Sequence, residues 1–193
     1  MNNMNKRFVK AIITMATVGL LSACTAGNLS DEPIETNPGV RSLGTLYNDQ
    51  LIENTAIDSI RRSSILLTDA NFNVVSFNGI VLLTGQAPSE DTRVLAGAKA
   101  QLVPNVRKVH NNMTVGPASK PLVRANDTLI TTQVKAMMVG ETSFPATRIK
   151  VFTESGVVYL MGLVTQVEAQ WAIRITSRAK GIQKIVKVFE YID

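Results

Sequence analysis

One pattern occurs twice in this chain, and the repetition limits its fold more than any other feature of the sequence. The segment Gly79 to Gly85, with glycines six residues apart, returns as Gly156 to Gly162, 77 positions further on. Two other landmarks recur at almost the same spacing: Asp49 to Ile52 matches Asp127 to Ile130, and Val106 to Val109 matches Ile182 to Ile185. A period of this length is that of a domain rather than of a solenoid repeat. The sequence therefore predicts two domains with one shared fold.

Each copy begins with the pattern of an amphipathic helix. Apolar or small residues recur at i, i+4, i+7 and i+8, which is the spacing of one helix face. The residues of this row are Ile52, Ala56, Ser59 and Ile60 in the first copy, and Ile130, Val134, Met137 and Met138 in the second. Each helix is therefore expected to bury this row against the rest of its domain.

A β-hairpin, a second helix and a final strand follow in each copy. The hairpin strands are expected at 73–77 and 80–84, and again at 148–153 and 157–161. Glu90 and Asp91 suit the first turn of a helix, and Thr165 with Glu168 forms the pattern of a capping box. The final strands are expected at 106–115 and 182–191. Since each final strand must pair with its hairpin, both helices of a copy have to cover the same sheet face.

Glycine is expected to have a structural role at four positions in the hairpins. Gly79 and Gly156 lie in the turns, where glycine adopts a positive φ without strain. Gly85 and Gly162 follow the second strands, where the missing side chain permits close packing or a bulge. No Gly-x-Gly-x-x-Gly or Gly-Lys-Ser/Thr pattern accompanies these glycines, so they do not predict a phosphate-binding loop.

The N-terminal segment resembles the signal peptide of a bacterial lipoprotein. Lys6, Arg7 and Lys10 precede an apolar stretch of about ten residues, which is too short to span a bilayer. Leu21-Ser22-Ala23-Cys24 then matches a lipobox. The resemblance implies cleavage before Cys24, a diacylglycerol on its thiol and an acyl group on the new amino terminus. Thr25, rather than aspartate, after the cysteine implies sorting to the outer membrane.

The hairpins and helices of both copies resemble the BON domain (bacterial OsmY and nodulation). The residues that carry the resemblance are Gly79 to Gly85, Gly156 to Gly162 and the Val-x-x-Val type strands. It implies an α+β fold of two tandem domains, each αββαβ, with a three-stranded mixed sheet covered on one face by two helices. The expected boundaries are a signal peptide at 1–23, a flexible tether at 24–44, BON domain 1 at 45–116, a linker at 117–124 and BON domain 2 at 125–193.

Charge argues against a nucleic-acid partner. The full chain has 20 basic and 15 acidic residues, but three basic residues belong to the leader, which leaves 17 against 15, or +2. A net charge of +2 is not typical of a protein that binds nucleic acid, and the export signal also argues against such a partner. The basic excess lies in the second copy, with nine basic and six acidic residues over 121–193, whereas 44–116 has six of each.

No constellation of residues predicts an enzyme, a metal site or a cofactor. His110 is the only histidine, and we interpret it as a surface residue in or beside the last strand of the first copy. A catalytic triad has no sequence signature here, and one histidine makes a poor metal site. With Cys24 lipidated, a cysteine nucleophile and a cysteine-based zinc site are excluded. Adjacent carboxylates such as Glu90 and Asp91 are better explained by helix capping than by acid–base catalysis.

The first helix of the second copy has apolar character on a second face. Leu129, Thr132, Ala136 and Val139 recur at 0, 3, 7 and 10, and this row points away from the core row. Lys135 borders it, and Arg124 is expected just before the helix. A membrane surface would accept both the apolar and the basic side chains. The alternative is that Leu129 and Val139 pack against the first domain or a nearby loop.

In the dual-BON outer-membrane lipoproteins that the chain resembles, this helix is the implied binding surface for anionic phospholipid such as phosphatidylglycerol. The candidate phospholipid-binding residues are therefore Leu129, Thr132, Gln133, Lys135, Ala136 and Val139. The resemblance further implies a non-catalytic role in outer-membrane integrity on the periplasmic face, with enrichment at division sites. Two alternatives remain: a module that binds envelope proteins, and a periplasmic holdase in envelope assembly or stress.

Overall fold

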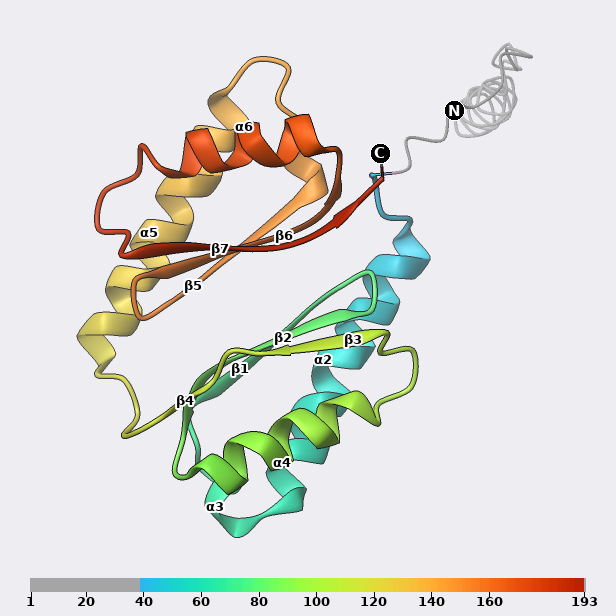
Figure 1. The fold of residues 1–193 in the computed structure, drawn as a ribbon, viewed down its shortest axis with the longest axis vertical. Helices are drawn as coiled ribbons and strands as arrows, with labels where there is room; N and C mark the ends of the chain where they lie inside the picture. Colours follow the sequence, from blue (N-terminus) through green and yellow to red (C-terminus); the bar gives the residue numbers. More distant parts are fainter. Residues whose placement is uncertain (1–38, 193) are drawn as a thin grey trace, which may run out of the picture. The chain divides into compact units, whose positions relative to one another are not determined.

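The computed structural model describes residues 39–192, and the predicted signal peptide, Cys24 and most of the tether lie outside the described residues. Each copy of the repeat forms one α+β domain, as Figure 1 shows. The first comprises α2 (Leu43–Ser63), α3 (Ile65–Thr68), β1 (Phe72–Phe77), β2 (Ile80–Ala87), α4 (Glu90–Gln101), β3 (Lys108–Asn111) and β4 (Thr114–Val115). The second comprises α5 (Pro121–Gly140), the 3-10 turn η1 (Ala146–Arg148), β5 (Ile149–Glu154), β6 (Val157–Val164), α6 (Gln166–Thr176) and β7 (Lys184–Tyr191). The predicted αββαβ order is confirmed, with the short α3 added in the first domain.

Both sheets are mixed, as predicted. The hairpin strands are antiparallel, and the last strand of each domain runs parallel to the second hairpin strand. The final strand expected at 106–115 is divided into β3 and β4, both of which pair with β2. The division occurs where the Asn111 side chain bonds to the backbone of Arg93 and Met113, and where Met113 is buried in the core. In the second domain β7 continues without a break over eight residues.

An aspartate from the first helix holds each hairpin turn. Asp49 accepts hydrogen bonds from the backbone N–H groups of Asn78 (2.9 Å) and Gly79 (3.0 Å). Asp127 accepts them from Ser155 (2.7 Å) and Gly156 (2.8 Å) in the same way. Both aspartates are buried, and these bonds satisfy turn donors that no strand partner can reach. This role explains why the aspartate recurs in the repeat.

The turn glycines have the backbone conformations that hairpins of this type need. Gly79 and Gly156 both have a φ of +74°, and each follows a residue that also has a positive φ. Gly85 and Gly162 lie where two backbones come close. A Cβ atom would lie 2.3 Å from the Asn71 carbonyl oxygen at Gly85, and 2.7 Å from that of Arg148 at Gly162.

The two helices that flank each sheet cover one of its faces, as predicted. In the first domain Ile52, Ala56 and Ile60 of α2 form a core with residues of β1, β2 and α4. In the second domain Ile130, Val134 and Met138 of α5 do the same with β5, β6 and α6. At the remaining positions of the predicted helix rows, Ser59 and Met137 are only half-buried. The capping box of Thr165 and Glu168 at the start of α6 is confirmed.

The other faces of the two sheets pack against each other. Because side chains alternate along a strand, neighbours of core residues point away from the helices. These neighbours form a third apolar cluster across the two domains: Val75, Phe77 and Leu82 with Tyr159, Met161 and Val188. Polar pairs border it, among them Lys150 with Glu53 (2.6 Å), Asn73 with Glu154 (3.1 Å) and Arg107 with Glu190. The layers of residues 39–192 are therefore helices, sheet, sheet and helices.

The first described residues link both domains before α2 begins. Gly39 lies so close to the second domain that a Cβ atom there would be 2.5 Å from Arg148 Cδ and 2.8 Å from the Leu163 carbonyl oxygen. Two residues later, the Arg41 guanidinium lies 4.0 Å from the centre of the Phe77 ring and bonds to Asp49 at 2.8 Å. We call residues 39–42 the strap, because they run from the second domain onto the first.

Two helices begin earlier than the expected domain boundaries. α2 begins at Leu43, inside the tether expected at 24–44, because Ser42 accepts a hydrogen bond from the Thr45 N–H and caps the helix. α5 begins at Pro121, inside the linker expected at 117–124, because proline is well suited to the first helical position. Arg124 therefore lies within α5 rather than before it.

Candidate functional site

α5 presents three rows of side chains with different surroundings. One row is buried in the core of the second domain and consists of Asp127, Ile130, Val134 and Met138. A second row points outward, and a third faces the first domain. Since the buried row is sufficient to fold the helix, the composition of the other two rows needs another explanation.

The outward row is exposed and apolar. Leu129 is 69% exposed and Val139 is 76% exposed, and Thr132 and Ala136 lie between them on the same exposed face. The alternative that Leu129 and Val139 pack against the first domain or a loop is therefore wrong. The Thr132 hydroxyl donates to the Thr128 carbonyl oxygen at 2.9 Å, so this polar group already has a partner within its own helix. Four of the six candidate lipid-binding residues thus share one face that is free of charge.

The other two candidates lie on opposite flanks of that face. Gln133 is half-buried, and its side-chain oxygen accepts a hydrogen bond from the Lys180 N–H at 3.3 Å. It therefore supports the loop after α6. Lys135 is exposed and lies on the flank that faces the first domain. The sequence pattern also missed Leu122, which is 82% exposed near the start of α5.

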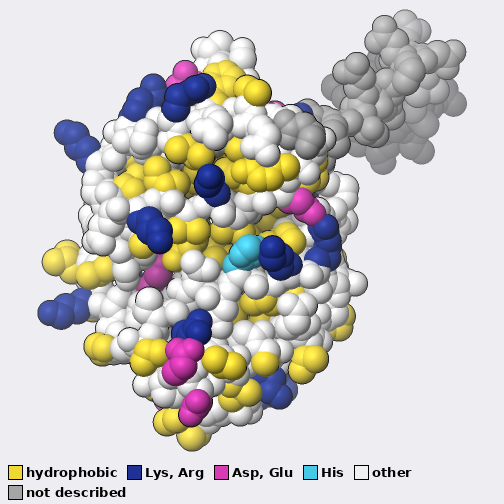
Figure 2. Space-filling view, viewed as in Figure 1, with side chains coloured by type: hydrophobic (Ala, Val, Ile, Leu, Met, Phe, Trp, Pro, Cys, Tyr) yellow, Lys and Arg dark blue, Asp and Glu magenta, His cyan; other side chains and the backbone are white. Residues whose placement is uncertain are grey.

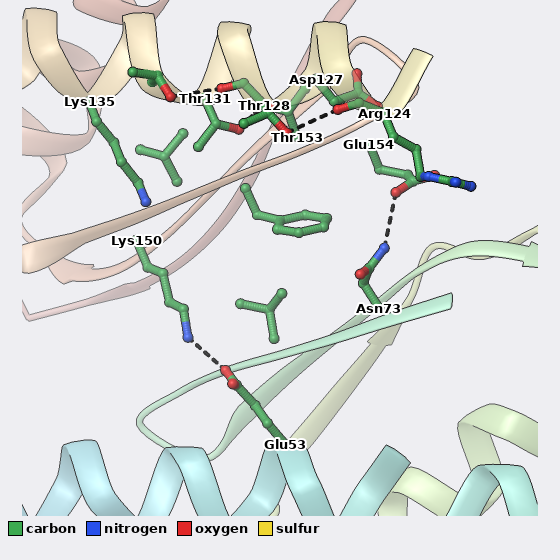
Figure 3. Close-up of a pocket in the computed structure, with 14 residues that line it drawn as sticks. Glu53, Asn73, Arg124, Asp127, Thr128, Thr131, Lys135, Lys150, Thr153 and Glu154 are labelled. Carbon is green, nitrogen blue, oxygen red and sulfur yellow. Dashed lines mark hydrogen bonds and ion pairs between the residues drawn. The ribbon is translucent and has the colours of Figure 1, made fainter. Parts of the chain in front are cut away.

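The third row borders a groove of about 550 Å³ between α5 and the first domain. Its members are Arg124, Thr128, Thr131 and Lys135, which recur at 0, 4, 7 and 11 and so follow one side of the helix. Figure 3 shows Arg124 and Lys135 at opposite ends of this row. Lys150 reaches across from β5, while Glu53 and Asn73 come from the first domain. The residues of the first domain form the second wall of the groove, and their place there depends on how the two domains pack. The sequence alone could therefore not reveal the groove.

The carboxylates that line the groove already have partners. Glu53 accepts hydrogen bonds from Lys150 Nζ at 2.6 Å and from the Ser76 N–H at 2.8 Å. Asp127 is occupied by the hairpin turn. Glu154 accepts from the side chains of Asn73 and Gln86, both at 3.1 Å. Burial is the main cause that raises the pKa of the Glu154 carboxyl above its usual value.

The basic groups of the groove are not all neutralised. Lys150 is paired with Glu53, and Arg124 donates to the Ser119 carbonyl oxygen at 2.9 Å. Within residues 39–192, no group forms a hydrogen bond or an ion pair with the side-chain ammonium of Lys135. Figure 3 shows the Lys135 ammonium pointing into the groove. The groove therefore offers one unpaired cation beside a row of hydroxyl groups.

The described residues offer no comparable arrangement for catalysis or metal binding. Among residues 39–192, no group of three or more His, Cys, Asp or Glu side chains could hold a metal ion. His110 lies on β3 and is half-buried, and burial followed by the charge of Lys108 lowers its pKa. Figure 2 shows this histidine in cyan, with Lys and Arg side chains scattered over that face rather than gathered in one patch. Within the described part of the chain, no helix is both long and apolar enough to cross a membrane.

Comparison with known proteins places both domains in a known group. The model of the BON domain family matches residues 48–117 and 126–193. The chain is 36% identical over 186 residues to the outer membrane lipoprotein DolP of Haemophilus influenzae (strain ATCC 51907 / DSM 11121 / KW20 / Rd), covering 95% of both chains. It is 31% identical over 166 residues to a 21 kDa hemolysin of Actinobacillus pleuropneumoniae, covering 86% of both.

Proposed function

Because this chain belongs to the BON domain family and is a homologue of the outer membrane lipoprotein DolP, we propose that it is a lipid-anchored protein that binds anionic phospholipid through α5 and thereby maintains outer-membrane integrity. The observation that carries the lipid-binding part is the exposed outward row of α5. Cys24 would carry the acyl anchor, and the folded domains would lie on the periplasmic side. We propose further that this contact enriches the protein at division sites.

The outward row supports a membrane contact of modest strength. Full burial of a leucine or valine side chain stabilises a complex by about 1.5–3 kcal/mol, and only Leu129, Val139 and Leu122 are large apolar groups here. An aromatic residue would suit the interface better than Leu129 does. A weak contact is sufficient if Cys24 is acylated, since the anchor makes the second contact intramolecular and raises its effective concentration.

Lipid binding is tested with the unacylated mature chain, so that the anchor cannot supply the membrane contact. Residues 24–193 with Cys24→Ser are sedimented with vesicles of phosphatidylglycerol or of phosphatidylcholine at low salt. We expect preferential binding to phosphatidylglycerol, and we expect Leu129→Asp to lower the affinity by more than about tenfold. The matched control is Leu51→Asp, because Leu51 occupies the same position in α2 and is 50% exposed. Equal sedimentation with both lipids, or equal loss in both variants, would contradict the proposal.

The anchor requires a separate measurement. Mass spectrometry of the protein extracted from outer membranes should show an N-terminal peptide that begins at Cys24 and carries three acyl chains. A Cys24→Ala variant should be recovered from the soluble periplasmic fraction. A mature N-terminus at another residue would disprove the anchor without affecting the α5 contact.

A protein-binding role is a second candidate, favoured by a surface on the first domain. Leu43, Tyr47 and Leu51 are 84%, 73% and 50% exposed at i, i+4 and i+8 of α2, so they form a continuous apolar row. Photocrosslinking from position 47 in cells distinguishes the partners. Crosslinks to an envelope protein would support this candidate, and crosslinks to lipid alone would oppose it.

A further inference from the structure

The exposed apolar row at the start of α2 is suited to contact an identical row on another copy of the chain. We propose that two copies associate through the first turns of α2, with Tyr47 of each copy packed on Gly44 of the other. This dimer rests on the protein-binding role of α2 described above, and it does not depend on lipid binding by α5.

The surface around Tyr47 is apolar and has no unpaired charge. Only two residues between 40 and 52 are charged, Arg41 and Asp49, and they pair with each other at 2.8 Å. Two identical surfaces carry identical charges, so a charged patch would repel its own copy, whereas a neutral patch does not. The large apolar side chains of this surface are all between 42% and 84% exposed: Val40, Leu43, Leu46, Tyr47 and Leu51.

Gly44 lies on this surface, although nothing within residues 39–192 requires a glycine there. It belongs to the first turn of α2 and does not have a positive φ. A Cβ atom at this position would meet only the Ser42 hydroxyl oxygen, at 3.7 Å. Glycine lowers the stability of a helix relative to alanine. A costly glycine beside open space therefore indicates the close approach of another molecule.

Tyr47 and Gly44 are complementary in a two-fold contact. They are three residues apart, so they are neighbours on one face of the helix. A two-fold axis between them would place each Tyr47 ring on the Gly44 of the other copy. Gly44 and Asn48 also border a groove of about 590 Å³ in the first domain, which would receive the edge of that ring.

The groove offers partners for the tyrosine hydroxyl group. Asn105 Nδ2 donates to Asn48 Oδ1 at 2.9 Å. Within residues 39–192, Asn48 Nδ2 and Asn105 Oδ1 form no hydrogen bond, so one can donate to the hydroxyl group and the other can accept from it. A buried tyrosine hydroxyl needs such a partner. A glycine beside paired amides fits a side chain of a protein better than it fits a bilayer surface.

The contact is small, so the dimer should be weak. Two helical turns from each copy bury less than about 1,200 Å² in total, which is typical of transient complexes. If Cys24 is acylated, both copies lie on one membrane surface, and the higher effective concentration favours the dimer.

Analytical ultracentrifugation of the unacylated mature chain, with Cys24→Ser, measures the association. We expect the average mass to rise from that of a monomer toward that of a dimer as the concentration increases from about 10 µM to about 1 mM. Tyr47→Asp should weaken the dimer at least tenfold. The matched control is Leu129→Asp, at the exposed apolar face of α5, which should change dimerisation less than twofold. A monomer at every concentration, or equal effects of the two variants, would overturn the proposal.

Gly44→Ala separates association from folding. Alanine should raise the midpoint of thermal unfolding by about 1–3 °C, because the helix gains stability. The same change should weaken the dimer at least fivefold, because the added methyl group occupies the place of the partner's ring. A Gly44→Ala dimer as strong as that of the wild type would disprove the contact at Gly44.

Engineered cysteines test the reciprocal geometry, since Cys24 is the only cysteine of the chain. In the Cys24→Ser background, Gly44→Cys and Tyr47→Cys chains are mixed and oxidised. The mixed disulfide between the two variants should form at least threefold faster than the disulfide of either variant with itself. Equal rates for the three disulfides would contradict the proposed two-fold contact.

The dimer and the two proposed functions can fail independently. If Tyr47→Asp reduces sedimentation with phosphatidylglycerol vesicles as much as Leu129→Asp does, α2 contacts the bilayer and the dimer proposal fails. If the wild type dimerises but does not sediment with vesicles, lipid binding fails and the dimer stands. If photocrosslinking from position 47 in cells captures another envelope protein and no second copy, the protein-binding role stands and the dimer fails.

Discussion

α2 and α5 occupy the same place in their domains, but their residues are similar only at the buried positions that the fold requires. Position by position, the buried residues Asp49, Ile52 and Ile60 correspond to Asp127, Ile130 and Met138. Outside the core the two helices differ. Where α5 has the outward Thr132 and Ala136, α2 has Asn54 and Asp58, and Asp58 pairs with Arg62 at 2.9 Å.

The rows that face the groove differ in a similar way. Where α5 has Arg124, Thr131 and Lys135, the equivalent residues of α2 are Leu46, Glu53 and Ile57. Glu53 is committed to Lys150 at the domain interface. Since one fold tolerates both sets of side chains, the fold itself does not demand the apolar and basic rows of α5. The difference between the helices thus separates residues that build the domain from residues that are available for a partner.

The largest expected effect concerns the aspartates that the two helices share. Asp127→Ala should destabilise the protein by about 2–4 kcal/mol, because two backbone donors lose their buried acceptor. Asp49→Ala should cost about 1 kcal/mol more, because it also leaves the Ser76 hydroxyl and Arg41 without this partner. Urea unfolding measures both. Equal or reversed losses would show that the bonds of Asp49 to Ser76 and Arg41 add no stability beyond the two turn bonds.

Acid should reduce the difference between wild type and Asp49→Ala. Burial raises the pKa of Asp49, but hydrogen bonds from Gly79, Ser76, Asn78 and Arg41 together outweigh it and hold the pKa below its usual value. A carboxylate with a lowered pKa in the folded state contributes stability above its unfolded pKa, and this contribution is lost as the pH falls through the folded pKa. Unfolding curves at pH 7 and at progressively lower pH should therefore converge. A constant difference across this range would contradict the effect of the ionised carboxylate.

A smaller difference is expected between the two turn glycines. Both have positive φ, so alanine is strained at either position by about 1 kcal/mol. A Cβ atom at Gly79 would also lie 2.7 Å from the Asn105 carbonyl oxygen, whereas at Gly156 it would meet the flexible Gln183 side chain at 2.9 Å. Gly79→Ala should therefore lower the free energy of unfolding by about 1 kcal/mol more than Gly156→Ala does. Thermal unfolding of the two variants is sufficient to rank them.

The smallest effect tests whether α2 can acquire the property of α5. Asn54→Thr with Asp58→Ala gives α2 the outward residues of α5 at two exposed positions, next to Leu51. Stability should change by less than about 0.5 kcal/mol, since neither residue is buried. Affinity for phosphatidylglycerol vesicles should rise by up to about fivefold, because one repelled carboxylate is removed from an apolar face. Unchanged affinity would mean that the outward residues of α5 are not sufficient to give α2 a membrane contact.

The sequence was sufficient to predict the elements and the order of the fold. Periodicity located both helix rows, and the glycines with their neighbours located the hairpins. The break between β3 and β4 was missed, because it depends on the Asn111 side chain and the buried Met113 rather than on a glycine or proline. The function of the recurring aspartates was also missed, since the bond from Asp127 to Gly156 spans 29 residues and has no local signature.

The candidate site was predictable only in part. The outward row of α5 could be derived from helical spacing, and the structure leaves Leu129 and Val139 exposed. Gln133 could not be separated from Lys135 by sequence, because its contact with the Lys180 N–H depends on a loop 47 residues away. The groove requires the packing of one sheet on the other, and neither repeat alone contains that information.

The strap has a mechanical consequence if the proposed acyl anchor is present at Cys24. Gly39 contacts the second domain, and it follows Cys24 by 15 residues, a length of chain that could span at most about 50 Å. This segment ends at the second domain, which also carries the outward row. A short connection to the anchor would therefore favour the approach of that domain to the bilayer. Tension on a lipid at Cys24 would reach Gly39 and Arg41 first, and these residues contact the second and the first domain respectively.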